Sequence, residues 1–158
     1  MNASLAERVV TAMQAKGMTC ATAESCTGGG VGSAITSVAG SSAIFLGGVI
    51  SYSNEVKVNV LGVSQESLAR VGAVSSEVAA QMASGAKRVI GSDFAVSLTG
   101  IAGPGGGSAE KPVGLVWFGL ASPNGVVTES HVFSGDRAQV RSAAVEHALK
   151  LLLCAVDG

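Results

Sequence analysis

The sequence has few charged residues and no segment apolar enough to span a membrane. Only 13% of its 158 residues are charged, the net charge is −1, and there is no block of basic residues. The electrostatic signature of a nucleic-acid-binding protein is therefore missing. The longest apolar run, residues 113–121, is well short of the roughly 18–20 residues of a membrane span. The N-terminus also lacks the apolar core of an export signal. We therefore expect a cytoplasmic protein with neither nucleic-acid nor membrane partners.

Cysteine and histidine are also scarce. The three cysteines, Cys20, Cys26 and Cys154, are widely spaced and form no CxxC pair, which argues against both a disulfide framework and a zinc site. Free thiols are typical of a reducing cytoplasm. The two histidines, His131 and His147, stand isolated in the sequence. We therefore expect no dedicated metal site.

Apolar residues, in contrast, are abundant. They make up 47% of the chain, and 158 residues suffice for one domain with a sizeable core. The sequence therefore predicts a single domain over residues 1–158. High apolarity with so few charges also indicates a buried subunit interface, so we expect a homo-oligomer, a dimer or larger.

Helical and strand-like patterns alternate along most of the chain. The patterns predict helices over 4–16, 27–38, 55–61 (with Asn54 as its cap), 77–90 and 137–156, and strands over 19–24, 45–53, 93–99, 113–121 and 126–133. Helices between strands imply parallel crossovers, whereas Asn124-Gly125 is typical of a hairpin turn. The predicted fold is α/β: a three-layer α/β/α sandwich with a mixed, mostly parallel sheet of about five or six strands.

A glycine-rich run near the N-terminus offers the first candidate site. Glu24-Ser25-Cys26-Thr27 follows the first predicted strand, and four glycines lie within the next five positions, 28–32. A strand, a tight turn and a helix start would combine a hydroxyl with free backbone N–H groups. Ser25 could act there as a nucleophile. The alternative is that Ser25 or Thr27 merely caps the helix.

A serine nucleophile needs a base, and Lys57 is the candidate. It follows the second predicted strand closely. In a parallel sheet the ends of the first two strands would share one edge, where ligands bind in open α/β folds. A buried lysine can serve as base when its pKa falls toward neutrality. The alternative is a solvated lysine in the first turn of a helix.

Two further segments could contact a ligand. Thr99 and Gly100 begin a glycine-rich loop after the third predicted strand, which is either a ligand-contacting loop or a flexible connector. Arg137 and Arg141 lie four residues apart on one face of the last predicted helix. They could clamp a phosphate or carboxylate, or they could form a solvated face.

These segments, with others, resemble the CinA C-terminal domain family. The similarity runs in order along nearly the whole chain and comprises seven blocks: Ala23-Glu-Ser-Cys-Thr-Gly-Gly29, Ala39-Gly-Ser-Ser42, Tyr52-Ser-Asn-Glu-x-Lys57, Gly72-Ala-Val-Ser75, Thr99-Gly-Ile-Ala-Gly-Pro104, Lys111-Pro-Val-Gly114 and Gly135-Asp-Arg137-x-x-Val-Arg141.

The resemblance implies an α/β/α fold and hydrolysis of the carboxamide of nicotinamide mononucleotide, with no metal or organic cofactor. It implies that Ser25 is the nucleophile, that Lys57 is its base and that Tyr52 lies in the site. Arg141, together with Arg137, would hold the substrate or order the pocket. Backbone groups around Cys26, Thr27 and Gly28, or in the Gly100 loop, would bind the oxyanion.

Two other hypotheses remain open on the sequence. The domain could be a nucleotide-binding or regulatory module without chemistry, linked to competence or DNA damage. Alternatively, Cys26 rather than Ser25 could be the nucleophile.

Overall fold

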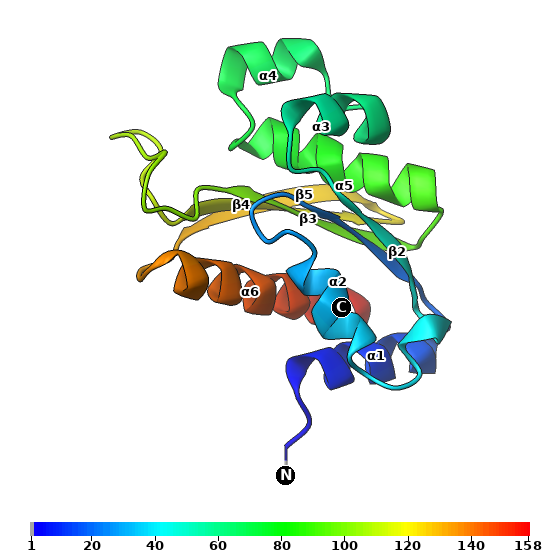
Figure 1. Cartoon of the computed structure of the whole chain (residues 1–158). Coiled ribbons are helices and arrows are strands. Elements are labelled where there is room, and N and C mark those ends of the chain that lie inside the picture. The colour runs from blue at the N-terminus through cyan, green and yellow to red at the C-terminus, as the bar shows by residue number, and fades with distance from the viewer. Residues whose placement is uncertain (1) are drawn as a thin grey trace.

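A computed structural model describes residues 2–158, which form a five-stranded sheet flanked by helices (Figure 1). The strand order is β2-β1-β3-β4-β5. The strands are β1 (Cys20–Glu24), β2 (Phe45–Ile50), β3 (Phe94–Gly100), β4 (Leu115–Ser122) and β5 (Gly125–Val132). β1 pairs in parallel with both β2 and β3, whereas β4 is antiparallel to β3 and to β5.

Helices cover both faces of the sheet, as Figure 1 shows. On one face lie α3 (Asn54–Leu61), α4 (Gln65–Val71) and α5 (Ser76–Ile90); on the other lie α1 (Leu5–Lys16), α2 (Gly30–Thr36) and α6 (Arg137–Asp157), and a 3-10 turn, η1 (Ser41–Ala43), precedes β2. This arrangement confirms the predicted α/β/α sandwich with a mixed sheet of five strands. Two of the four strand pairings are parallel and two are antiparallel, whereas a mostly parallel sheet was predicted. None of the helices among residues 2–158 has both the length and the apolarity to cross a membrane.

Each face of the sheet has its own apolar core. Larger side chains, such as Leu98 and Phe118, pack against α1, α2 and α6. Alanines of the sheet, such as Ala23 and Ala95, meet α5 on the other face. Burial on both faces explains why β1 is buried at every position, including the polar residues Thr22 and Glu24.

Local sequence signals set most helix boundaries. Ser4 and Asp136 form capping boxes at the starts of α1 and α6, and Gly17 and Gly91 end α1 and α5 in the left-handed conformation. α2 differs from the prediction because it begins at Gly30 rather than at residue 27. Positive φ angles of 60° and 102° at Gly28 and Gly29 exclude these two residues from a right-handed helix. α4 was not predicted.

The topology brings three strand ends to one edge of the sheet. In the register, Glu24 at the end of β1 lies opposite Ile50 of β2 and Leu98 of β3. The segments that follow these parallel strands therefore begin side by side. This is the edge at which the sequence predicts the site.

Candidate active site

Ser25 and Lys57 meet at this edge. Ser25 directly follows β1, and Lys57 lies in the first turns of α3. The Nζ atom of Lys57 is 3.0 Å from the Oγ atom of Ser25. Both residues are buried, and Lys57 is only 1% exposed. The two side chains therefore lie close together, as the sequence predicted.

The surroundings of Lys57 suit a neutral amine. Besides Ser25, its Nζ contacts the carbonyl oxygens of Ser51 at 2.7 Å and Tyr52 at 3.2 Å. A neutral amine can donate its two N–H groups to these carbonyls and accept the Ser25 hydroxyl proton on its lone pair. Within residues 2–158 no carboxylate forms an ion pair with Lys57. Burial lowers the pKa of Lys57 from its ordinary value of 10.5, because desolvation disfavours the ammonium form.

Glu24 organises the turn that carries Ser25. Its buried carboxylate accepts hydrogen bonds from the Thr27 hydroxyl at 2.7 Å, from the Val31 N–H at 2.8 Å and from the Gly32 N–H at 3.1 Å. A carboxylate at a helix N-terminus satisfies free donors and is favoured by the helix dipole. The start of α2 is therefore occupied by Glu24 and is not available as an anion site. This role of Glu24 was not predicted, although an acidic residue directly before the turn was a signal for it.

Arg141 holds the same turn from the opposite side. Its guanidinium donates to the carbonyl oxygens of Cys26 at 3.1 Å and Thr27 at 3.2 Å. These bonds join the first turns of α6 to a segment more than 110 residues earlier in the chain. Arg141 therefore orders the turn beside Ser25 and does not line the pocket.

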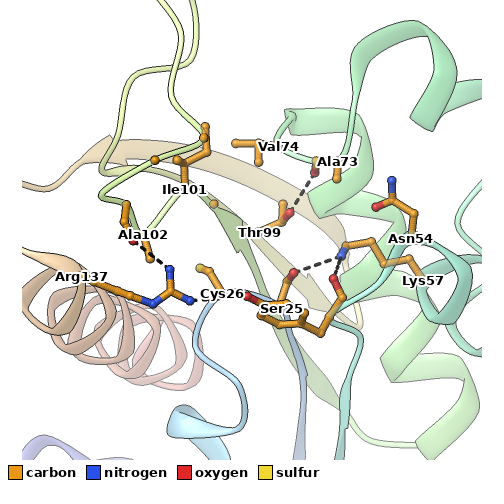
Figure 2. A pocket seen from close by; sticks show the side chains of 15 residues that line it. Ser25, Cys26, Asn54, Lys57, Ala73, Val74, Thr99, Ile101, Ala102 and Arg137 are labelled. Atoms are coloured by element: carbon orange, nitrogen blue, oxygen red, sulfur yellow. Dashed lines mark hydrogen bonds between the residues drawn. The ribbon is translucent and has the colours of Figure 1, made fainter.

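A pocket of about 300 Å³ opens above Ser25 and Lys57 (Figure 2), within the usual size range of ligand sites. Its walls come from the Ser25 turn, the start of α3, the segment before α5, the loop after β3 and the start of α6. The lining residues are Ser25, Cys26, Tyr52, Asn54, Lys57, Ala73, Val74, Thr99, Gly100, Ile101, Ala102, Gly103, Gly105, Gly106 and Arg137. The Thr99 hydroxyl donates to the Ala73 carbonyl at 2.9 Å and thereby joins two of these walls.

Arg137 is the cationic group at the rim of the pocket. Its guanidinium donates to the Gly103 carbonyl at 2.9 Å and approaches the Tyr52 hydroxyl at 3.4 Å. No carboxylate among residues 2–158 forms an ion pair with it. An exposed guanidinium without an anionic partner beside a pocket suits a phosphate or carboxylate ligand.

The pocket brings together most, but not all, of the residues that the sequence singled out. Seven of them line it: Ser25, Cys26, Tyr52, Lys57, Thr99, Gly100 and Arg137. Thr27, Gly28 and Arg141 lie behind its wall. Asn54, Ala73 and Val74 were not assigned to the site, although they fall within blocks that carry the family resemblance.

The glycines after Ser25 serve backbone conformation and helix packing. Gly28 and Gly29 have positive φ angles, and a Cβ atom on Gly30 would lie only 2.8 Å from Val145 of α6. None of these glycines lines the pocket. They allow the turn and the close approach of α2 to α6.

Cys26 lines the pocket but is a poor nucleophile in this setting. Its side chain is buried, and burial raises the pKa of the thiol to about 11. Since the thiolate is the reactive form, only about one molecule in 10⁴ would carry it at pH 7. The geometry therefore favours Ser25 over Cys26.

The two histidines lie outside the pocket, but they are not isolated as the sequence suggested. The Nε2 atoms of His131 and His147 lie 2.8 Å and 3.4 Å from the same Glu129 carboxylate oxygen. Glu129 and His131 come from β5, and His147 comes from α6.

Comparison with known proteins identifies close relatives. The family model described as "CinA C-terminal domain" matches residues 2–156. The chain is 52% identical over 149 residues to the nicotinamide-nucleotide amidohydrolase PncC of Escherichia coli K12, with 94% of this chain and 90% of that protein covered. It is 53% identical to a CinA-like protein of Thermosynechococcus vestitus, of which it spans 36%. A solved structure of a competence/damage inducible protein from Agrobacterium tumefaciens is 46% identical, with a TM-score of 0.94 over 98% of this chain and 94% of that one.

Proposed function

The chain belongs to the CinA C-terminal domain family, and from this membership we propose that it is an amidase that hydrolyses the carboxamide of nicotinamide mononucleotide. The products are nicotinic acid mononucleotide and ammonia, a step of pyridine-nucleotide salvage. The observation that carries the proposal is the buried Lys57 amine, 3.0 Å from the Ser25 hydroxyl at the floor of a pocket. The 52% identity to a nicotinamide-nucleotide amidohydrolase over most of both chains supports the substrate.

In the first half of the proposed reaction, Ser25 Oγ attacks the carboxamide carbon while neutral Lys57 takes the hydroxyl proton. The resulting oxyanion needs preorganised donors. The Gly28 N–H already donates to the Ser25 carbonyl at 3.1 Å, and the Val31 and Gly32 N–H groups donate to Glu24. The Gly30 N–H donates to the Thr27 carbonyl at 3.1 Å, so among the backbone donors of residues 26–32 the N–H groups of Cys26, Thr27 and Gly29 remain. Collapse of the intermediate breaks the C–N bond, and the Lys57 ammonium gives its proton to the leaving ammonia.

In the second half, water hydrolyses the ester formed on Ser25. Lys57, neutral again, takes a proton from the water as its oxygen attacks the acyl carbon. Lys57 then returns this proton to Ser25 Oγ as the acid leaves. The carbonyls of Ser51 and Tyr52, at 2.7 Å and 3.2 Å, keep the amine directed at Ser25 in both halves. One lysine therefore acts as base and acid alternately.

The proposal assigns the substrate phosphate to Arg137. Arg137 lies at the rim, across the pocket from Lys57 (Figure 2), and has no carboxylate partner among residues 2–158. Tyr52, whose side chain is 62% exposed, would flank the substrate. Thr99 and Gly100 would contact the nicotinamide end from the opposite wall, and Thr27, Gly28 and Arg141 would act by fixing the Ser25 turn.

Ammonia release from nicotinamide mononucleotide tests the proposal directly. We expect Ser25→Ala and Lys57→Ala to lower kcat by at least about 10³-fold. Ser33→Ala, on the exposed face of α2, and Lys150→Ala, in an exposed ion pair with Glu146, are matched controls that should retain full activity. Normal turnover in both Ser25→Ala and Lys57→Ala would overturn the assignment.

A nucleotide-binding or regulatory module without chemistry is the second candidate. The relative from Agrobacterium tumefaciens is described as competence/damage inducible. This alternative predicts that the mononucleotide binds with no ammonia formed, even at high protein concentration. The lowered pKa of Lys57 beside a serine is expected of an enzyme and not required of a binding module.

The remaining proposals concern partners and location. We propose that the protein works in the cytoplasm, which the three free thiols support, and that it binds no nucleic acid, which its net charge of −1 supports. We also propose a homo-oligomer. The edge strand β2 exposes Leu46 and Ile50 by 48% and 56%, and such apolar edges are often covered by another chain. Sedimentation of wild type and Ile50→Lys tests this assembly.

A further inference from the structure

Three potential metal ligands converge on one point between β5 and α6. The Nε2 atoms of His131 and His147 lie 2.8 Å and 3.4 Å from the same oxygen of Glu129. All three ligand atoms are within 4.8 Å of one another. Ligands of a tetrahedral ion with metal–ligand bonds of about 2.0–2.1 Å are separated by about 3.3 Å. The spacing of the cluster thus requires only small adjustments to hold such an ion.

The fold places the three side chains on one shared face. Glu129 and His131 are two residues apart on β5, so both point to the same side of the sheet. His147 approaches them from α6. Its ring packs 4.7 Å from that of Phe118 and 6.3 Å from that of Phe133, centroid to centroid. The aromatic contacts fix the imidazole, while the 42% and 43% exposure of the His131 and Glu129 side chains leaves a path for an ion.

The cluster is incompletely satisfied without an added group. The Nε2 atom of His147 is buried and makes no hydrogen bond within residues 2–158, although the Glu129 oxygen lies nearby. The two imidazole rings are only 4.1 Å apart. A metal ion would accept the lone pairs of both rings and give the buried Nε2 atom of His147 the partner that it lacks.

We propose that Glu129, His131 and His147 form a binding site for a divalent transition-metal ion, of which Zn²⁺ suits the ligands best. Two imidazoles and one carboxylate are a common three-ligand set for zinc, with water in the fourth position. The site is separate from the pocket and takes no part in the amide chemistry. By joining edge strand β5 to α6 it clamps the helix that carries Arg137 and Arg141. The proposal does not depend on the proposed function.

The experiment is titration of the metal-free protein with Zn²⁺, and with Co²⁺ as a coloured probe. We expect one ion per chain and visible Co²⁺ absorption of a four-coordinate site. We also expect the melting temperature to rise by about 5–10 °C when free Zn²⁺ exceeds Kd 100-fold. Glu129→Gln and His131→Gln, both on the partly exposed edge strand, should weaken binding at least tenfold while the melting temperature with chelator changes little.

Two control variants separate this site from other ligands. Glu146→Gln removes an exposed carboxylate from the same helix, and Cys154→Ser removes the exposed thiol; neither should change the affinity. Stoichiometric binding that survives Glu129→Gln and His131→Gln, or that is lost in Cys154→Ser, would overturn the proposal. So would the absence of any binding by the wild type at 1 mM Zn²⁺, on the order of the weakest specific affinities.

Discussion

The Nζ atom of Lys57 lies 3.0 Å from the Oγ atom of Ser25, although 32 residues separate the two in the chain. Parallel pairing of β1 with β2 produces this contact, because it brings the residues after both strands to one sheet edge. The contact also fixes the proposed chemistry. Burial favours loss of the Lys57 proton, and no carboxylate among residues 2–158 forms an ion pair that would oppose it.

The first prediction concerns the pH dependence of catalysis. Because burial lowers the pKa of Lys57 from 10.5, the fraction of neutral amine grows as pH rises through the shifted value. We expect kcat/KM to increase with pH to a plateau, and the midpoint of the increase to lie below pH 10.5. A pH–rate profile measured by ammonia release checks this. A midpoint at or above 10.5, or a flat profile, would contradict a Lys57 base.

The same shift predicts a change in stability with pH. The folded state releases the Lys57 proton at a lower pH than the unfolded state, so the unfolded state binds more protons between the two pKa values. The free energy of unfolding should therefore rise with pH across this window, which ends at 10.5. Urea titrations of wild type and Lys57→Met over this range test it. Parallel curves for the two proteins would show that the lysine is not shifted.

Glu24 is predicted to support catalysis by holding the Ser25 turn in place and not by taking part in the reaction. Glu24→Gln replaces an acceptor-only carboxylate that receives three hydrogen bonds. One amide hydrogen would then face the N–H groups of α2. We expect a loss of about 1–3 kcal/mol in the free energy of unfolding and a roughly 10–100-fold drop in kcat as the Ser25 turn loosens. Glu55→Gln, an exposed acid in the first turn of α3, is the control. If Glu24→Gln showed the expected loss of stability but an unchanged kcat, the catalytic geometry of the Ser25 turn would not depend on Glu24.

How far the sequence predicted this molecule depends on the range of the interactions involved. Caps and glycine stops are local, so helix ends such as those at Asp136 and Gly91 agree with the predicted ranges 137–156 and 77–90. Long-range contacts left no such signal. Arg141 looked like a ligand-binding residue, and only the docking of α6 on the Ser25 turn reveals its bonds to Cys26 and Thr27. The meeting of His147 with Glu129 is equally non-local.

Cys26 is predicted to be dispensable for the chemical step. Its thiol is buried and its pKa is raised to about 11, so it remains protonated at neutral pH. Cys26→Ala should retain kcat within about tenfold, with any loss coming from altered packing beside Ser25. Ammonia release before and after treatment with a thiol alkylating agent complements the variant. Loss of more than about 10³-fold in Cys26→Ala, with activity retained in Ser25→Ala, would make Cys26 the nucleophile.

The two arginines of α6 should give opposite kinetic signatures. Arg137 reaches the pocket rim, so Arg137→Met should raise KM for nicotinamide mononucleotide about 10–100-fold, the value of a charge-assisted contact of about 1.5–3 kcal/mol. It should have little effect on nicotinamide riboside, which has no phosphate. Arg141 instead holds the carbonyls of Cys26 and Thr27, so Arg141→Met should lower kcat for both substrates alike. Steady-state kinetics with the two amides separates these roles. Equal losses on both substrates in Arg137→Met would show that the phosphate is bound elsewhere, because only a direct phosphate contact can discriminate between them.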